Sequence, residues 1–238
     1  MSDETSPADD DAKDPASTTG EVLLTESERR RKRTAGYLKL WGIETDLSTL
    51  SVPLEATSIL ATTAEIIGKA KVYCLISLKG QGLTLREVFA FADAYEIWEH
   101  VSVAENNYIL DEAAPESDDV QYAWRYEALN ALLWALGHSK HLGFPTDASD
   151  PAKAVERCMQ LILQPSSQPS SQPTTQSNTQ SKGQARTPKD VLDAADVAFA
   201  LQAITLSVPV NQPAPADLQR GVVYERALAF RWLLNPAQ

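Results

Sequence analysis

The segment from Trp124 to Gly137 constrains the fold more than any other part of the sequence. From Ala128 onward it is apolar on almost every side of a helix, with Asn130 as the exception. A helix that is apolar all round is enclosed by neighbouring elements, because an exposed face would carry polar residues. We therefore expect this Trp- and Leu-rich segment to form the central helix of the fold, ending at Gly137.

The rest of the chain also shows the signals of helices. Capping boxes, in which a Thr or Ser precedes a Glu by three residues, stand at Thr25, Thr84 and Ser102. Pro151 and Pro188 mark two more helix starts. No two alternating runs face each other across an Asn-Gly or Asp-Gly turn, so no β-hairpin is expected. We predict an all-α fold of about eight helices, near residues 26–41, 54–78, 85–100, 103–111, 117–136, 151–163, 188–206 and 216–234.

Two segments lack the apolar residues that a core needs. Residues 1–24 carry seven acidic residues and one basic residue among Ser, Thr and Pro, and we interpret them as a disordered acidic tail. Residues 164–186 are rich in Gln, Ser and Pro, which is typical of a flexible low-complexity insertion. We expect residues 25–163 and 187–238 to be the two parts of one helical domain.

The charge and the lack of targeting signals narrow the class of protein. The 21 basic and 32 acidic residues leave a net charge of −11, which disfavours binding to the polyanionic backbone of a nucleic acid. No signal peptide opens the sequence, and no apolar run approaches the ~20 residues that cross a bilayer. We expect a soluble cytoplasmic protein without a membrane partner, in which Cys74 and Cys158 are buried thiols.

One basic run, from Arg29 to Arg33, stands apart from the acidic composition. Five cations on one helix can bind a phosphate backbone or anionic lipid. However, no aromatic residue interleaves the run, and acidic residues surround it. We interpret it as a solvated helix face or a contact for the acidic tail, with nucleic-acid binding as the alternative.

The last predicted helix repeats a pattern of the central one. Tyr, Glu, Ala, Trp and Leu recur at the same spacing in residues 126–136 and 224–234, five identities in eleven positions. Two helices that share such a pattern are expected in similar environments.

Each glutamate of this pattern has an arginine near it in sequence, but on a different face of the same helix. If the two helices pack together, Glu127 can pair with Arg226 or Arg231. In the same way, Glu225 can pair with Arg125. We therefore predict a buried or half-buried network of ion pairs between the two helices.

The two glutamates also permit a second interpretation. Two carboxylates can act as general acid and base, and neighbouring aromatic and basic side chains suit a carbohydrate or aromatic pocket. We favour structural ion pairs, because such networks occur in many proteins without catalysis. The sequence assigns no catalytic or binding residue. Under the hydrolase hypothesis the catalytic candidates are Glu127, Glu225, Tyr126 and Tyr224, and the binding candidates are Arg125, Arg226, Trp134 and Trp232.

The sequence lacks the motifs of metal and cofactor sites. Its three histidines are His100, His138 and His141, and the last two lie in a predicted turn without an evident third ligand. No paired CxxC, zincin motif, EF-hand loop, phosphate-binding glycine loop or Gly-x-Ser-x-Gly elbow occurs. We predict no metal and no cofactor.

The segment AWRYEALNALLWALG, at residues 123–137, resembles the signature of the bacterial family called domain of unknown function 4272. RKRTAGYL followed by Gly42-Ile43, residues 102–110, VLDAAD at 191–196 and residues 222–232 resemble further parts of the family. The resemblance covers roughly residues 29–234. Because the family has no assigned activity, the resemblance implies a fold and no chemistry.

The chain also departs from the family. An arginine and a tryptophan that the resemblance implies after Asp196 are replaced by apolar or neutral residues at 199–203. The sequence thus predicts an uncharacterised helical protein with a structural, protein-interaction or accessory role, for instance as an immunity-type partner of another bacterial protein. A hydrolase is the alternative, and the oligomeric state stays open.

Overall fold

The computed structural model of the chain describes residues 24–47, 60–163 and 184–236. All regular secondary structure in these ranges is helical, which confirms the predicted all-α fold. The predicted tail, except for Leu24, and most of the predicted insertion lie outside the described residues. The helices are α1 (Glu26–Leu40), α2 (Thr63–Gly80), α3 (Leu85–Ala94), η2 (Trp98–His100), α4 (Val103–Leu110), α5 (Glu116–Ala123), α6 (Arg125–Ala135), α7 (Pro151–Leu163), α8 (Pro188–Ser207), η3 (Pro215–Asp217) and α9 (Arg220–Leu234).

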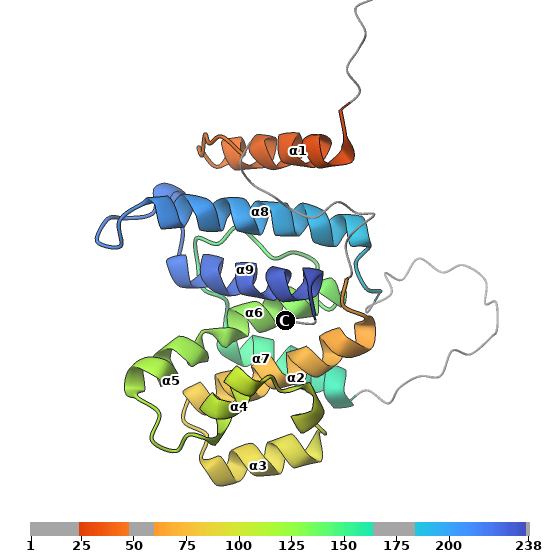
Figure 1. Cartoon of the computed structure of the whole chain (residues 1–238), viewed down its shortest axis with the longest axis vertical. Coiled ribbons are helices and arrows are strands. Elements are labelled where there is room, and N and C mark those ends of the chain that lie inside the picture. Colours follow the sequence, from red (N-terminus) through yellow and green to blue (C-terminus); the bar gives the residue numbers. More distant parts are fainter. Residues whose placement is uncertain (1–23, 48–59, 164–183, 237–238) are drawn as a thin grey trace, which may run out of the picture.

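The helices form a stack of layers (Figure 1). At one end α1 lies across α8, and α9 and α6 follow beneath α8. α2 and α7 pack on the other side of α6, and α3 and α4 lie against α2 at the opposite end. Because each layer contacts the next, α6 occupies the middle of the stack.

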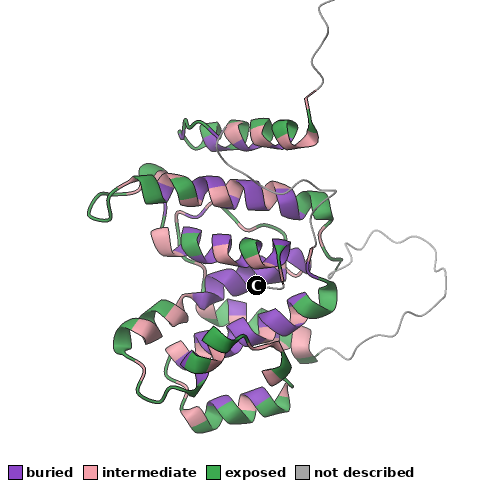
Figure 2. Ribbon diagram, viewed as in Figure 1, coloured by how far each residue is buried: buried purple, intermediate pink, exposed green. Residues whose placement is uncertain are grey.

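The central helix α6 is enclosed, as its composition predicts. Every residue from Arg125 to Leu133 is buried, and Figure 2 shows α6 as a continuously buried ribbon beside the half-exposed outer helices. Leu129, Leu132 and Leu133 belong to one apolar cluster with residues of α2, α7 and α9. Burial of one such side chain contributes about 1.5–3 kcal/mol, so α6 is a major source of stability.

Local capping signals place most helix starts correctly. The predicted boxes at Thr25, Thr84 and Ser102 are all confirmed. Another capping box, formed by Thr62 and Glu65, starts α2. Residues 60–62 are not helical, so α2 begins later than predicted. The predicted start near residue 54 lies outside the described residues.

The helix that we predicted across Trp124 is instead two helices, α5 and α6. An unbroken helix would bond the Glu127 amide to the Ala123 carbonyl, but this amide donates to the Trp124 carbonyl at 2.9 Å. The Ala123 carbonyl accepts from Ser77 Oγ of α2 at 3.4 Å. A Cβ on Gly80 would lie 2.6 Å from the Ala123 nitrogen, so α5 ends in close contact with α2. This contact between helices ends α5 before α6 begins.

Left-handed backbone shortens two other predicted helices. Glu96 has φ +53°, so α3 ends at Ala94 and only η2 follows. Ala216 and Asp217 have φ +52° and +55°, so α9 begins at Arg220 rather than near residue 216. Residues other than glycine rarely adopt this conformation, which is why the sequence patterns did not indicate either boundary.

Two polar contacts fix α1 on α8. Arg33 Nη2 donates to Asp193 Oδ1 at 2.7 Å, and Thr34 Oγ1 donates to Asp196 Oδ2 at 2.6 Å. Thr34 and Asp196 are buried, and Arg30 is only 1% exposed. The basic run is therefore not the uniform solvated face that we expected, because part of it lies in the contact with α8.

Both cysteines, Cys74 on α2 and Cys158 on α7, are free and buried, in agreement with the predicted thiols. The hydrogen bond to Cys74 is the largest cause that raises the pKa of Cys158, and burial raises it further.

Among the described helices, none combines the length and the apolar composition that a membrane span requires.

Candidate functional site

The helices α6 and α9 lie side by side and run in the same direction. Arg125 at the start of α6 contacts Glu225 in the first half of α9. Trp134 near the end of α6 meets Phe230 farther along α9, with ring centroids 5.9 Å apart. Because both contacts advance together along the two helices, the repeated patterns face each other, and the predicted packing is confirmed.

Glu127 is completely buried, and both of its carboxylate oxygens accept hydrogen bonds. Oε2 accepts from Nε and Nη2 of Arg226, each at 3.2 Å, and Oε1 accepts from the backbone amide of Ser149. The predicted Glu127–Arg226 pair is thus confirmed. Arg231, the alternative partner, donates to Gln202 Oε1 instead.

Glu225 is also buried, but it has fewer partners. Its Oε2 accepts from Nη1 of Arg125 at 2.9 Å, which confirms the second predicted pair. Burial raises the pKa of Glu225 to about 7, the charge of Arg125 offsets this rise only in part, and Glu127 adds to it. Glu225 therefore changes between its charged and neutral forms near neutral pH.

The two arginines also differ in the number of hydrogen bonds that they make, and the partner of Glu127 again has more. Arg226 Nη1 donates to the Gly143 carbonyl at 3.0 Å, so all three guanidinium nitrogens of Arg226 are bonded. The Arg125 guanidinium lies 5.5 Å from the ring centre of Tyr73 and 5.3 Å from that of Tyr122. Its buried Nε forms no hydrogen bond with a described residue. Every guanidinium nitrogen of Arg226 is thus bonded to a described residue, whereas Nε of Arg125 is not.

The remaining candidate residues do not gather into one site. Tyr126 is buried and stacks on Trp124 with centroids 5.9 Å apart, whereas Tyr224, at the matching position of α9, is 46% exposed. Trp134 and Trp232 are half-buried and line different cavities. The tyrosine and tryptophan candidates therefore do not form one site together.

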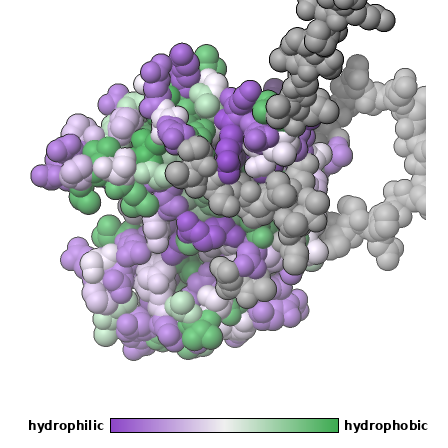
Figure 3. Space-filling model, turned by 45° about the horizontal axis from the view of Figure 1, so that its top comes forward, coloured by the Kyte–Doolittle hydropathy of each residue, from purple (hydrophilic) through white to green (hydrophobic). Residues whose placement is uncertain are grey.

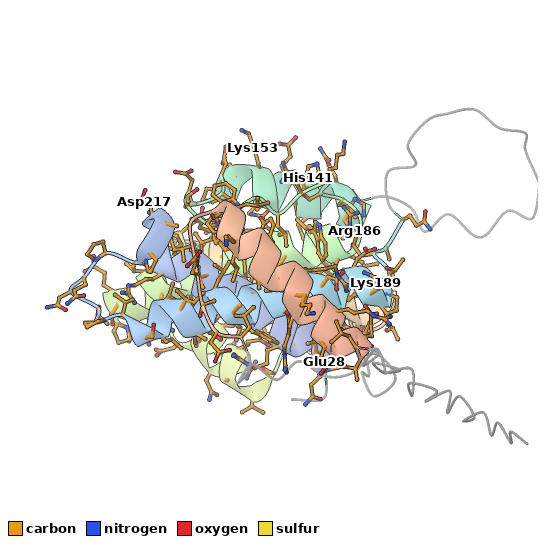
Figure 4. All side chains as sticks on the ribbon, turned by 90° about the horizontal axis from the view of Figure 1, so that it is seen from above. Glu28, His141, Lys153, Arg186, Lys189 and Asp217 are labelled. Atoms are coloured by element: carbon orange, nitrogen blue, oxygen red, sulfur yellow. The ribbon has the colours of Figure 1, made fainter. Side chains whose placement is uncertain are left out.

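A cavity of about 710 Å³ opens between α1, α8, α9 and the segment that follows α6. We call it the aromatic cavity. Seen from above α1, His141 and Arg186, which both line it, lie on the same side of that helix (Figure 4). The side chains that form its walls include Tyr37, Trp41, Trp134, Phe144, Phe230 and Arg226.

The rings at the mouth of the aromatic cavity contact one another. Trp41 and Phe144 stack with centroids 4.0 Å apart and planes 3° from parallel. Tyr37 meets Phe144 edge-on at 6.1 Å. Such ring contacts contribute about 0.5–1.5 kcal/mol beyond the area that they bury, so the wall is preformed.

Charged residues of both signs line the aromatic cavity. The basic ones include Lys140 and Arg186, and the acidic ones are Asp190 and Asp193 of α8. Arg186 is held in place because its Nη2 donates to the carbonyls of Ser139 and Lys140 at 2.8 and 2.9 Å. The cavity thus combines an apolar interior with charges of both signs at its border.

A smaller cavity, of about 260 Å³, lies between α2, α4 and α9. We call it the tyrosine cavity, because Tyr73 and Tyr122 line it together with Arg125. Lys69 also lines it and binds Glu105, with Nζ 2.6 and 2.7 Å from the two carboxylate oxygens. The side chains of this pair are only 7% and 12% exposed. A buried lysine and a buried arginine therefore border the same small space.

No sequence pattern described above indicated Lys69, Tyr73 or Tyr122. The available signal was Lys69 within the apolar run of α2, because a lysine on a buried helix needs a carboxylate partner. Glu105 was indicated only as a capping residue, yet it also binds Lys69. The Ser149 amide comes from a loop without any sequence signal.

Within residues 24–47, 60–163 and 184–236, no three His, Cys, Asp or Glu side chains are placed to hold a metal ion together. His138 and His141 lie in the turn after α6, as predicted. Burial lowers the pKa of His138, which favours its neutral form at pH 7.

Comparison with known proteins adds a family but no activity. The family model described as "Domain of unknown function (DUF4272)" matches residues 30–238 of the chain. No curated protein and no solved structure matches the chain. The function therefore has to be inferred from the ion pairs and cavities themselves.

Proposed function

The chain belongs to the DUF4272 family, and on that premise we propose that it is an interaction protein whose aromatic cavity receives apolar side chains of a protein partner. The observation that carries this proposal is the 710 Å³ cavity with a preformed aromatic wall. Its volume falls within the roughly 300–1,000 Å³ of typical binding pockets.

The end of α1 supports a protein as the partner. Tyr37, Leu40 and Trp41 are 38%, 83% and 44% exposed, so large apolar side chains stand beside the opening. Tyrosine and tryptophan are enriched among residues that dominate protein–protein binding energy. On the face drawn in Figure 3, hydrophobic residues form separate patches among hydrophilic ones.

The residues that line the aromatic cavity indicate which side chains of a partner would fit it. Val197, Ala198 and Phe230 offer an apolar surface for aliphatic or aromatic anchor side chains. Arg186 and Asp190, four residues apart in sequence, also line it and favour charges of both signs next to those anchors. A protein segment that carries apolar anchors together with acidic and basic residues matches this lining.

The hydrolase alternative receives less support from the geometry. General acid–base catalysis requires that both carboxylates reach the substrate. Glu127 is completely buried with both oxygens bonded, and Glu225 is 2% exposed and bonded to Arg125. Neither carboxylate therefore has an open approach, and the pairs are better explained as structural.

Site-specific photo-crosslinking tests the proposed role. A photoreactive phenylalanine analogue replaces Tyr37 beside the aromatic cavity or, as the control, the exposed Tyr224 on α9, which does not line that cavity. Both proteins are irradiated in lysate of the native host. A third protein carries the analogue at Tyr37 together with Ala194→Trp, which fills the cavity.

The proposal predicts one protein that crosslinks at position 37, is absent at position 224 and is lost when Ala194→Trp fills the cavity. No crosslink at position 37 would contradict it. The same protein captured equally at both positions, or captured despite the filled cavity, would also contradict it.

A further inference from the structure

We propose that the tyrosine cavity binds a small carboxylate, with the Tyr73 hydroxyl and the Arg125 guanidinium as hydrogen-bond donors. This site is separate from the aromatic cavity and does not depend on the proposed interaction role. Three features carry the proposal: donors that the fold leaves without partners, an excess of positive charge, and aromatic walls.

Tyr73 carries a hydroxyl that the described fold does not use. The residue is 3% exposed and lines the cavity, and its hydroxyl forms no hydrogen bond with any residue that the structure describes. Because Tyr73 lines the cavity, a ligand there can accept a hydrogen bond from this hydroxyl in place of water. Burial raises the pKa of Tyr73 far above its usual value, so the hydroxyl keeps its proton and donates.

Arg125 offers the second donor. Its Nη1 is bonded to Glu225, but neither Nη2 nor Nε forms a hydrogen bond with a described residue. The rings of Tyr73 and Tyr122 lie on its flanks and hold the guanidinium in place. A planar guanidinium presents its N–H groups in a rigid fork that suits a carboxylate.

The charges around the cavity favour an anion. Lys69, Arg125 and Arg231 line it, and Glu105 is the carboxylate among its described lining residues. Even when the ionised Glu225 beside Arg125 is included, cations exceed carboxylates. In a chain with a net charge of −11, such a cationic cavity is a local exception that attracts small anions.

The size and walls of the cavity select the ligand further. A volume of about 260 Å³ is smaller than most pockets for drug-sized molecules. The rings of Tyr122 and Trp232 line it and can pack on a flat hydrocarbon body. A carboxylate on a small aromatic or aliphatic group matches both the donors and the walls, so benzoate is a suitable probe.

Isothermal titration calorimetry of the full chain with benzoate tests this inference. We expect saturable binding to the wild type. Tyr73→Phe should weaken binding roughly 5–10-fold, the effect of one lost hydrogen bond, and Arg125→Lys should weaken it more than about 10-fold. The matched control is Tyr126→Phe, the same change at a buried tyrosine that does not line the cavity, and it should leave the affinity unchanged.

Thermal unfolding distinguishes a binding role of Tyr73 from a structural one. Because the hydroxyl has no described partner, Tyr73→Phe should unfold at the wild-type temperature or above it. The variant should also lose the rise in Tm that benzoate gives the wild type. Absence of saturable binding, an unchanged affinity in Tyr73→Phe, or an equal loss in Tyr126→Phe would overturn the proposal. Tighter binding of inorganic phosphate than of benzoate would overturn the assignment to a carboxylate.

Discussion

The two glutamate–arginine pairs occupy matching positions of similar helices, yet their surroundings differ. Glu127 has both oxygens bonded, to Arg226 and to the Ser149 amide. Glu225 has one bond, to Arg125, among the described residues, and its pKa is raised to about 7. Both arginines line a cavity, but both carboxylate oxygens and all three guanidinium nitrogens of the Glu127 pair are bonded to described residues, whereas the Glu225 pair has one such bond.

The difference shows that a repeated helix pattern determines where a glutamate lies but not which groups surround it. The Ser149 amide belongs to the segment before α7, and the rings around Arg125 come from α2 and α5. None of these elements is part of the repeated pattern. We therefore expect the Glu127 pair to contribute more to stability and the Glu225 pair to respond more to pH.

The largest expected effect is that of Glu127→Ala. Removing this carboxylate leaves Arg226 buried with an uncompensated charge and the Ser149 amide without its acceptor. Breaking a buried pair in this way costs about 3–5 kcal/mol. The free energy of unfolding, measured by urea denaturation followed by circular dichroism, should fall by that amount.

Glu127→Gln is the matched control for this variant, because it keeps the shape and one oxygen acceptor. It should lose clearly less stability than Glu127→Ala. An unfolding midpoint of Glu127→Ala equal to that of the wild type would mean that Glu127 is not buried against Arg226.

A smaller effect is expected for Glu225→Ala, about 2–3 kcal/mol. Glu225 accepts one hydrogen bond from a described residue, so its removal breaks fewer contacts than removal of Glu127, and Arg125 keeps its contacts with the rings of Tyr73 and Tyr122. The same urea denaturation measures this loss. If Glu225→Ala costs as much as Glu127→Ala, the distinction between the two pairs is lost.

The smallest effect concerns pH. In the folded state the pKa of Glu225 is about 7, above the usual value of 4.5 that it recovers on unfolding. The native protein therefore binds the proton more tightly, and the stabilisation that this gives is complete below about pH 4.5 and is lost as the pH rises through 7. Relative to Glu225→Gln, the wild type should lose on the order of 2 kcal/mol between about pH 5 and pH 8.

Urea denaturation of both proteins at several pH values measures this difference. Subtracting the variant removes the contribution of every other titrating group that the two share. A difference that stays constant with pH, or that increases in favour of the wild type as the pH rises, would show that the pKa of Glu225 is not raised.

Much of the fold could be predicted because its signals act within a few residues. The capping boxes at Thr25 and Thr84 position helix starts from a hydroxyl and a carboxylate three residues apart. The end of α5 could not be predicted in this way. It depends on Ser77 and Gly80 of α2, which are far from Ala123 in sequence.

The candidate site also has one part that the sequence predicts and one part that it does not. The pairs between α6 and α9 could be predicted, because the repeated Glu positions and the nearby Arg residues are visible in one sequence. The tyrosine cavity could not, because Tyr73, Glu105 and Trp232 meet only when α2, α4 and α9 pack. Tertiary packing leaves no periodic signal in the chain, whereas caps and helix faces do.

A double-mutant cycle on Glu127 and Arg226 measures whether these two side chains form a pair between α6 and α9. Urea denaturation gives the free energy of unfolding of the wild type, Glu127→Ala, Arg226→Ala and the double variant. If the two side chains form a closed buried pair, removing both should cost less than the sum of the single losses, by about 1–3 kcal/mol. Single losses that add to within about 0.5 kcal/mol would contradict the pairing across α6 and α9.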